Sequence, residues 1–395
     1  MSKKALVIGV DMVKFTKPGE HLPYEIMVEK AVKGALDNAG ISYTDIEQAF
    51  ASYVYGDSTS GQTALYRVGM TGIPIINVHN NCSSGSTALF LARQAIQSGA
   101  VDCVLAVGFE EMQKGAIRSV WGDRTSPLDL FSEKLSKMAP YEQEGPIALR
   151  LFGASANYYM EKYQPSDTIF AKVAVKSRNH ALANPYAMFH TPLTTEEVVT
   201  SPLIFPHYLT KLCACPPSCG AAAVIVCSEH FAKKHGLTNQ AVEIIGQAVA
   251  TDTPETYKNP IELVGYSMTK RAATEVYEQT SVGPEEIDVV ELHDCFTPNE
   301  VITYEGLQLC GEGEAEVLIF NEDNTYGGKY VVNPSGGLMS KGHPLGATGL
   351  AQCCELVWQL RGEAKERQIP NVKTALQHNL GLGGAVVVTM YQKFS

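Results

Sequence analysis

The chain has 395 residues, of which 45% are hydrophobic, so it can form two or three globular domains around a large core. Its formal net charge of −11 argues against nucleic-acid binding, because that binding depends on lysine and arginine side chains that neutralise phosphates. No stretch reaches the roughly 18 consecutive apolar residues of a membrane span.

The terminal segments and the cysteines bear on the compartment. Only a six-residue apolar run precedes Asp11, which favours a first strand over a secretory signal. The last residues, 391–395, do not match the peroxisomal tripeptide address. Ten cysteines without regular spacing predict reduced thiols rather than disulfides. These features fit a bacterial cytoplasm, or a peroxisome or another organelle matrix reached by a different signal.

Short strand-like runs alternate with longer helical patterns along the chain, which is typical of an α/β fold built from βαβ units. The clearest strand-like runs are residues 5–10, 104–107, 223–226, 242–245 and 386–388. Residues 116–212 are rich in lysine, tyrosine, proline and asparagine and show weaker periodicity. We interpret this segment as an inserted loop domain that shapes a substrate pocket.

Two segments repeat later in the chain in the same order. Residues 40–47 resemble residues 282–288, and each follows an apolar helix and precedes a strand. The runs 82–87 and 343–348 both carry glycine at the fourth position and threonine at the sixth, and each opens a helix that ends at a glycine. The repeat predicts two similar halves, residues 1–115 with 213–240 and residues 241–395, with residues 116–212 between them.

The repeat places Cys82 and His343 at equivalent helix starts, with Pro344 in the first helical turn. A helix N-terminus stabilises a thiolate by up to about 2 kcal/mol, which lowers a cysteine pKa by about 1.5 units. Because that leaves much of the thiol protonated at neutral pH, a general base is needed. An imidazole can supply it, so Cys82 and His343 form a candidate nucleophile and base.

His293 and Cys295 lie two residues apart at the end of a predicted strand, so their side chains share one face. The run that follows, Thr297–Glu300, is typical of a capping box with proline at the first helical position. The pair therefore lies at a strand-to-helix turn, where catalytic groups of α/β sheets gather. Asp294 points away from both and is expected to orient a neighbour.

Other cysteines have simpler interpretations. A group at positions 213, 215, 219 and 227 suggests zinc, but the spacing C-x-C-x3-C-x7-C differs from the usual zinc patterns, so we expect no metal. Cys353 and Cys354 fall in an apolar helical pattern and are expected in the core.

Several motifs together resemble the signature blocks of thiolases along essentially the whole chain. They are Asn81-Cys82-Ser83-Ser84-Gly85-Ser86, Asn333-Pro334-Ser335-Gly336-Gly337, Gly342-His343-Pro344-Leu345-Gly346 and Gly381-Leu382-Gly383-Gly384. Most thiolases have Asn-Glu-Ala-Phe where this chain has His293-Asp294-Cys295-Phe296, and Cys-x-Gly where it has His378-Asn379-Leu380. Both departures resemble the sterol-carrier-protein-type thiolases, which act on branched and long-chain 3-ketoacyl-CoA esters.

This resemblance implies a fold and a set of roles. The fold would be two βαβ-type halves in a five-layered αβαβα arrangement. Cys82 would attack the 3-keto carbon, His343 would take its proton, and Cys295 would protonate the leaving carbanion and later deprotonate CoA. His293 would donate to one oxyanion, and backbone N–H groups of Cys82 and of the Leu380-Gly381 turn would hold the acyl oxygen. His378 would take the position of the missing Cys-x-Gly cysteine, with no assigned role.

The leading hypothesis is therefore a 3-ketoacyl-CoA thiolase of lipid β-oxidation, which acts as a homodimer with coenzyme A as co-substrate and no bound cofactor. The same residues could instead run the Claisen condensation. A third possibility is a catalytically silent acyl-CoA-binding scaffold, against which the complete set of four catalytic residues argues. The chain stops after the glycine-rich strand, so we do not expect it to transfer sterols itself.

Overall fold

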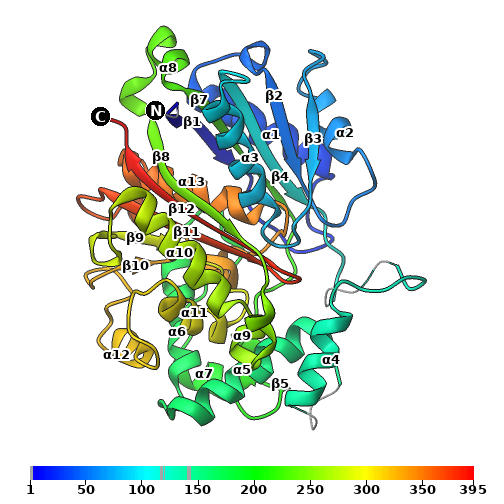
Figure 1. Cartoon of the computed structure of the whole chain (residues 1–395), viewed down its shortest axis with the longest axis vertical. Helices are drawn as coiled ribbons and strands as arrows, with labels where there is room; N and C mark the ends of the chain where they lie inside the picture. Colours follow the sequence, from blue (N-terminus) through cyan, green and yellow to red (C-terminus); the bar gives the residue numbers. More distant parts are fainter. Residues whose placement is uncertain (1–2, 116–118, 120, 140–143) are drawn as a thin grey trace.

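The computed structural model describes residues 3–395 apart from 116–118, 120 and 140–143. Its centre is a ten-stranded sheet in the order β10-β9-β11-β12-β8-β1-β7-β4-β2-β3 (Figure 1). The strands of the first half are β1 (Ala5–Met12), β2 (Gln48–Ser52), β3 (Ile75–Val78), β4 (Cys103–Glu110) and β7 (Gly220–Ser228). Those of the second half are β8 (Val242–Ala250), β9 (Val289–Glu291), β10 (Val331–Val332), β11 (Thr374–Gly381) and β12 (Ala385–Lys393). Each of the five predicted strands lies within one of these longer strands, so all five are confirmed.

The two sets of strands follow one plan. In each set the strands lie in the order first, fifth, fourth, second, third. The second strand of each set runs parallel to the third and the fourth, whereas the fifth is antiparallel to both of its neighbours. The sets join where β1 pairs with β8, at Leu6↔Glu243 and Val7↔Val242. The predicted internal repeat is confirmed by this shared topology.

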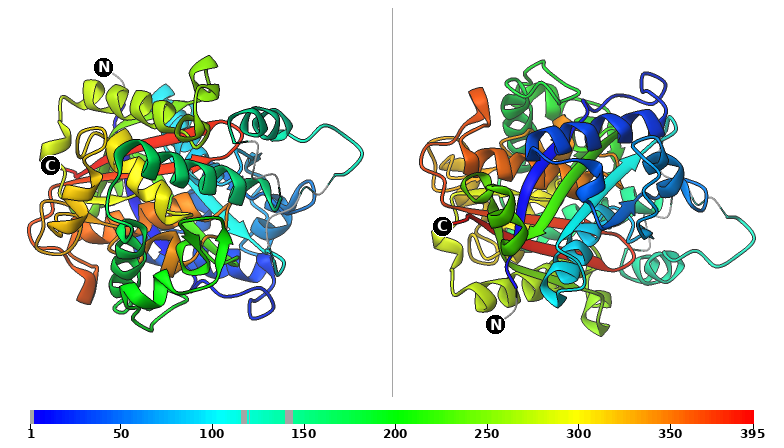
Figure 2. Two further views of the ribbon diagram at one scale, coloured as in Figure 1. Left: turned by 90° about the horizontal axis from the view of Figure 1, so that it is seen from below. Right: turned by 90° about the horizontal axis from the view of Figure 1, so that it is seen from above.

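Matching helices complete five layers. α1 (Tyr24–Ala39) covers β1 and β7, and α10 (Tyr266–Thr280) covers β8 and β12; Figure 2, right, shows the blue helix α1 lying across its strands. α3 (Ser84–Ser98) and α13 (Thr348–Arg361) pack together between the two half-sheets, in a core that both halves share. The order α1, half-sheet, α3 with α13, half-sheet, α10 is the expected αβαβα arrangement. Smaller helices are α2 (Ser60–Tyr66), α8 (Glu229–His235), α11 (Thr297–Gly306) and α12 (Ala315–Phe320).

Where it is described, the segment 116–212 forms helices and a hairpin in spite of its weak periodicity, and its assignment as a loop domain that shapes a substrate pocket stays a prediction. It contains α4 (Asp129–Met138), α5 (Ile147–Tyr163), α6 (Ile169–Ala181), α7 (Thr195–Val199) and a small hairpin of β5 (Leu203–Phe205) and β6 (Leu209–Thr210). These helices gather at one end of the molecule, at the bottom of Figure 1 and in front in Figure 2, left. The domain boundaries given above stay predictions.

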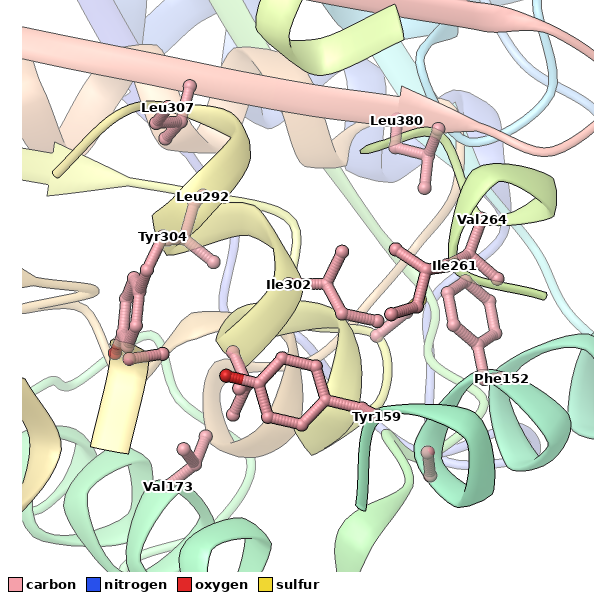
Figure 3. Close-up of a cluster of buried hydrophobic side chains, with 14 of the residues drawn as sticks. Phe152, Tyr159, Val173, Ile261, Val264, Leu292, Ile302, Tyr304, Leu307 and Leu380 are labelled. Carbon is pink, nitrogen blue, oxygen red and sulfur yellow. The ribbon is translucent and has the colours of Figure 1, made fainter. Parts of the chain in front are cut away.

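One hydrophobic cluster ties these helices to the second half. Figure 3 shows Phe152 and Tyr159 of α5 beside Ile302 of α11 and Ile261 of α9 (Pro260–Leu263). Burial of such large side chains contributes about 1.5–3 kcal/mol each, so the helices are held firmly against the segment that follows β9. Within the described residues, no helix combines the length and the apolar character that a bilayer crossing requires. All ten cysteines are free thiols.

Candidate active site

Cys82 lies in the tight turn between β3 and α3, two residues before the helix begins. Asn81 takes a left-handed backbone conformation with φ of 50°, and the Ser83 N–H donates to the carbonyl of Asn80 at 3.1 Å. The turn buries the Cys82 side chain, which is 7% exposed. Cys82 is therefore at a helix start, as predicted.

His343 lies further from its helix than expected, because α13 begins five residues later, at Thr348. Pro344 thus precedes the helix instead of standing in its first turn, which corrects that prediction. The hydrogen bonds of the repeat are nevertheless the same. Thr87 and Thr348 both donate their backbone N–H over 2.9 Å and their hydroxyl over 3.0 Å to a carbonyl four residues earlier. Cys82 and His343 are therefore equivalent positions in the two halves.

The structure brings the four predicted catalytic residues together. The Sγ of Cys82 and one ring nitrogen each of His293 and His343 all lie within 4.8 Å of one another. The two imidazole rings meet edge to face, with centroids 4.9 Å apart and planes at 87°. Cys295 is buried near them, close enough to Cys82 and to Cys215 that a negative charge on either sulfur would raise its pKa.

His293 and Cys295 do not belong to the strand itself, since β9 ends at Glu291. They lie in the connection to α11, where the Cys215 N–H donates to the carbonyl of Cys295 at 2.9 Å and the Asn299 amide donates to that of His293. Phe152 of α5 stacks on Phe296, with ring centroids 4.8 Å apart. This contact holds the end of the connection against α5. The insertion between the halves thus helps position the site.

The predicted capping box at Thr297–Glu300 is wrong. Phe296 is the N-cap of α11 and Thr297 is already inside the helix, so no side chain caps it. Glu300 instead forms a buried ion pair with Lys176. Asp294 does orient a neighbour, as expected, because its carboxylate accepts the Leu338 N–H at 2.6 Å and so holds the π-helical turn Gly337–Lys341 that leads to His343.

Thr348 determines which nitrogen of His343 can act as a base. The Thr348 hydroxyl donates its one hydrogen to the Pro344 carbonyl, so at 2.7 Å from Nδ1 of His343 it must accept the hydrogen of that nitrogen. The Nε2 atom therefore carries a free lone pair. It is buried and has no hydrogen-bond partner among the residues that the structure describes.

His293 has the opposite arrangement of protons. The Asn379 amide Nδ2 donates to Nδ1 of His293 at 3.0 Å, so the ring hydrogen is on Nε2. One imidazole therefore offers a lone pair and the other offers an N–H. This pairing suits a general base beside an oxyanion donor.

Burial keeps the site uncharged at rest. It raises the pKa of Cys82 to about 12, with a smaller contribution from the nearby carboxyl of Glu110, and it lowers the pKa of His343 to about 3. Burial likewise lowers the pKa of His293 well below its ordinary value and raises that of Cys295 well above it. The expected stabilisation of the Cys82 thiolate by the helix is outweighed. If Cys82 acts as a nucleophile and His343 as its base, the proton would therefore have to move as the bond to the substrate forms.

His378 does not take the place of the Cys-x-Gly cysteine, which corrects that prediction. Its side chain lies on the face of β11 toward α10, where Nε2 is 3.0 Å from the Thr269 hydroxyl, although its Nδ1 accepts the His293 backbone N–H at 3.4 Å. Alternate residues of a strand face opposite sides, so Asn379 is the residue that faces the site. Asn379-Leu380-Gly381 also has the Cys-x-Gly spacing.

Leu380 and Gly381 differ in what they contribute. The Leu380 side chain belongs to the hydrophobic cluster behind the site. Gly381 packs against the turn that holds Cys82, since a Cβ there would be 2.2 Å from the carbonyl oxygen of Asn80. Only glycine permits this approach, which brings the Gly381 backbone beside the nucleophile.

Two site residues, Asn379 and Thr348, were not assigned a role from the sequence. Thr348 was visible as a matched threonine of the internal repeat, and Asn379 could have been found by aligning Asn-x-Gly with Cys-x-Gly. Glu110 gave no sequence signal. It is buried, accepts N–H groups of Val54, Tyr55 and Gly346, and has a pKa raised to about 7 by burial.

Cys82, His293 and His343 are also the one group of histidine, cysteine and carboxylate side chains, within the described part of the chain, that could hold a metal ion. One cysteine and two histidines are known zinc ligands. A coordinating imidazole must offer a lone pair, whereas Nε2 of His293 carries a hydrogen. The arrangement therefore fits acid–base chemistry better than metal binding.

Comparisons with known proteins agree with this geometry. The thiolase N-terminal domain family matches residues 6–200, and the thiolase C-terminal domain-like family matches residues 248–391. Human sterol carrier protein 2 is 52% identical over 99% of this chain and 72% of its own length. An acetyl-CoA acetyltransferase of Methanothermobacter thermautotrophicus is 32% identical over 98% of this chain and 99% of its own.

Among solved structures, the Ltp2-ChsH2(DUF35) aldolase matches with a TM-score of 0.84 and 23% identity over 99% of this chain and 98% of its own. That likeness concerns the fold alone. The sequence matches extend over both halves and nearly the whole length, so this chain belongs to the thiolase family of acyltransferases, which use coenzyme A as a substrate.

Proposed function

We propose that the protein is a degradative thiolase that cleaves 3-ketoacyl-CoA esters with CoA through an acyl-Cys82 intermediate. The observation that carries this proposal is the opposite protonation of the two imidazoles beside Cys82. His343 offers a lone pair that can take the thiol proton, and His293 offers an N–H that can hold a developing oxyanion.

The first half-reaction uses all four residues. Sγ of Cys82 bonds to the 3-keto carbon as its proton passes to Nε2 of His343, and the C2–C3 bond breaks. The electron pair stays with the leaving acyl-CoA as an enolate, whose thioester oxygen His293 stabilises. The buried Cys295 thiol then gives its proton to C2, which releases acetyl-CoA or propanoyl-CoA.

The second half-reaction returns each proton to its origin. The Cys295 thiolate takes the proton of incoming CoA, and the CoA thiolate attacks the carbonyl carbon of the acyl-Cys82 thioester. The Cys82 sulfur leaves and recovers its proton from His343, and the shortened acyl-CoA departs. The acyl oxygen would rest on the backbone N–H of Cys82 and on the Gly381 region, which packs against the same turn.

A branched or long acyl chain of lipid β-oxidation is the proposed substrate class. The likeness to sterol carrier protein 2 supports a lipid acyl group. So does the position of the helices of residues 129–199, which pack against the segment carrying His293 and Cys295 through Phe152 and Phe296.

The ten free thiols, two of them reactive here, suit a reducing cytosol or organelle matrix.

The exposed edge of the sheet supports a homodimer. β3 is the last strand in the sheet order, and Ile76 on it is 41% exposed. Tyr66 and Met70 nearby in the chain are exposed as well. An unpaired edge with apolar neighbours invites a second strand, and a second copy of this chain would supply one. A solution mass that corresponds to one chain would contradict this.

Cys82→Ala tests the proposed chemistry. We expect CoA-dependent loss of straight and 2-methyl-branched 3-ketoacyl-CoA with the wild-type protein, together with an acyl mass on the intact chain. Cys82→Ala should lose both, because the nucleophile is gone. Cys310→Ala is the matched control, since that half-buried thiol follows α11 and lies outside the cluster of four residues. Unchanged turnover in Cys82→Ala would favour a different function.

A further inference from the structure

A row of buried polar side chains extends behind His293, from β12 through β11 to α3, the helix that follows Cys82. Gln377 and Asn379 lie two residues apart on β11 and face the central helix layer. Gln377, Asn379 and Ser86 of α3 are fully buried, at 0% exposure. Burying polar groups costs free energy of folding unless each one is hydrogen-bonded. Each of these side chains is therefore expected to have hydrogen-bond partners.

The direction of these hydrogen bonds is fixed at one end by a backbone carbonyl. The Gln377 side-chain nitrogen is 2.6 Å from the carbonyl oxygen of Gly349. A carbonyl only accepts, so the amide group cannot be reversed. The other atom of that amide, its oxygen, accepts the hydroxyl of Tyr391.

The remaining bonds follow from the first. Gln377 directs its second amide hydrogen to the Ser86 hydroxyl at 2.8 Å, with Oε1 of Gln352 as a more distant acceptor at 3.3 Å. The Ser86 hydroxyl gives its own hydrogen to Oδ1 of Asn379 at 2.9 Å. The amide nitrogen of Asn379 must then face Nδ1 of His293, where it donates over 3.0 Å. The hydrogen of the imidazole is left on Nε2.

We propose that Gln377, Ser86 and Asn379 are positioning residues that hold His293 in the Nε2–H form and so make it an oxyanion donor. This proposal rests on the proposed thiolase chemistry and deepens it. A reversed Asn379 would present an oxygen to Nδ1 and draw the hydrogen there. Nε2 would then offer a lone pair to the substrate oxygen, which would repel it.

The packing of α13 supports a built arrangement. A Cβ on Gly349 would be 2.2 Å from the Ser86 hydroxyl and 2.6 Å from Oδ1 of Asn379. Glycine is therefore needed where α13 passes the two residues, and the close approach also brings the Gly349 carbonyl onto Gln377. The central helix pair is thus shaped around these hydrogen bonds.

Asn379→Asp is the direct test, because it keeps the shape and still accepts from Ser86. The carboxylate oxygen that faces His293 should draw the hydrogen to Nδ1. We expect kcat for thiolysis to fall by about 10²–10³-fold, as for loss of one oxyanion donor, with little change in KM. Lowering the pH should then restore part of the activity relative to wild type, because a protonated imidazole donates from both nitrogens.

NMR of ¹⁵N-labelled histidine reads the tautomer without any assay. Wild type should show His293 protonated at Nε2, Asn379→Asp should show it protonated at Nδ1, and His293→Ala identifies the signals. Ser86→Ala is a milder variant, in which the freed Asn379 amide should give a mixture of tautomers and a smaller loss of kcat. Asn184→Asp is the matched control, a buried asparagine whose side chain bonds to Ser335 and Tyr186.

The outcomes separate the two proposals. If the wild-type protein cleaves no 3-ketoacyl-CoA, the proposed function is wrong. The NMR signals alone then test whether Asn379 sets the tautomer of His293. If wild type is active but Asn379→Asp keeps its kcat, or keeps His293 protonated only at Nε2, the positioning role is wrong. Equal losses in Asn379→Asp and Asn184→Asp, without a pH-dependent recovery, would also overturn it.

Discussion

At the scale of single residues, the protonation of the two site imidazoles depends on the hydroxyl of Thr348 and the amide of Asn379. The Thr348 hydroxyl donates its single hydrogen to the Pro344 carbonyl. In the hydrogen bond between Thr348 and His343, Nδ1 of His343 must therefore be the donor. The free lone pair on Nε2 follows. A threonine five residues after His343 thus determines which ring nitrogen offers a lone pair.

Thr348→Val should therefore slow catalysis without removing a catalytic group. The methyl group keeps the volume, but it cannot accept from Nδ1, so the imidazole loses its orientation and its preferred tautomer. We expect kcat for thiolysis to fall by about 10–100-fold, as for other lost supporting hydrogen bonds. Thr348→Ser retains the hydroxyl and should keep most of the activity. Equal rates for valine and serine would show that the hydroxyl has no such role.

The sequence predicted the four candidate catalytic residues better than the residues that support them. Cys82, His293, Cys295 and His343 stand in short motifs whose spacing can be read directly, and the structure brings them together. Asn379 and His378 are neighbours in sequence, and only the pairing of β11 in the sheet decides which of them faces Cys82. The protonation of His343 depends on Thr348, five residues away, whereas that of His293 depends on Asn379, 86 residues away, and on the bond from Ser86 to Asn379, which spans 293 residues.

At the scale of elements, the two halves meet where the segment Gly342–Ala347 crosses β2 and β4. The Ser52 hydroxyl donates to the Gly346 carbonyl at 2.8 Å, and the Gly346 N–H donates to Glu110 at 3.0 Å. One residue of the second half, Gly346, is therefore held by two strands of the first. His343, three residues earlier, is positioned by this contact.

Gly108→Ala tests how tightly that contact is built. A Cβ on Gly108 would be 2.1 Å from the carbonyl oxygen of Gly346, which is backbone and cannot turn aside. We expect the free energy of unfolding to fall by about 1–3 kcal/mol, as for other overpacked sites, and kcat to fall with it because His343 moves. Urea unfolding and thiolysis rates check this. Gly122→Ala is the control, since its Cβ would meet no described atom within 4 Å; a loss in it as large as in Gly108→Ala would contradict the argument.

Helices were predicted less well than strands, for a physical reason. The strands of both halves are β-branched and bounded by turns, so their pattern is visible. In α5, residues 150–156 are all buried, since the helix packs against neighbours on several sides. A helix without a polar face has no 3.6-residue alternation to detect, so the sequence of residues 116–212 does not predict these helices.

At the scale of the whole molecule, folding buries several imidazoles in their neutral form. Burial lowers the pKa of His180, His343 and His378 to about 3 each, and that of His293 well below its ordinary value. An unfolded histidine titrates near 6.5. As the pH falls below that value, these histidines bind protons in the unfolded chain but not in the folded chain. They therefore lower the free energy of unfolding in acid.

His180 allows this loss of stability in acid to be measured at a residue outside the candidate active site. It lies in α6, its Nδ1 donates to the carbonyl of Asn333 at 3.0 Å and its Nε2 accepts from the Thr325 hydroxyl at 2.7 Å. The pKa of His180 is lowered in the folded state. Its contribution to the free energy of unfolding is therefore fully present above pH 6.5 and is lost progressively as the pH falls toward about 3. His180→Gln removes the titration and can keep one of the two hydrogen bonds.

We expect His180→Gln to be less stable than wild type at about pH 7.5, because a buried hydrogen bond is lost, at a cost of about 1–3 kcal/mol. Between about pH 7.5 and about pH 5, however, wild type should lose about 2 kcal/mol more of its free energy of unfolding than the variant, from the linkage of one proton to unfolding. Urea unfolding at the two pH values measures both quantities. Parallel losses in the two proteins would mean that His180 is protonated in the folded state, and that its two hydrogen bonds do not hold it neutral.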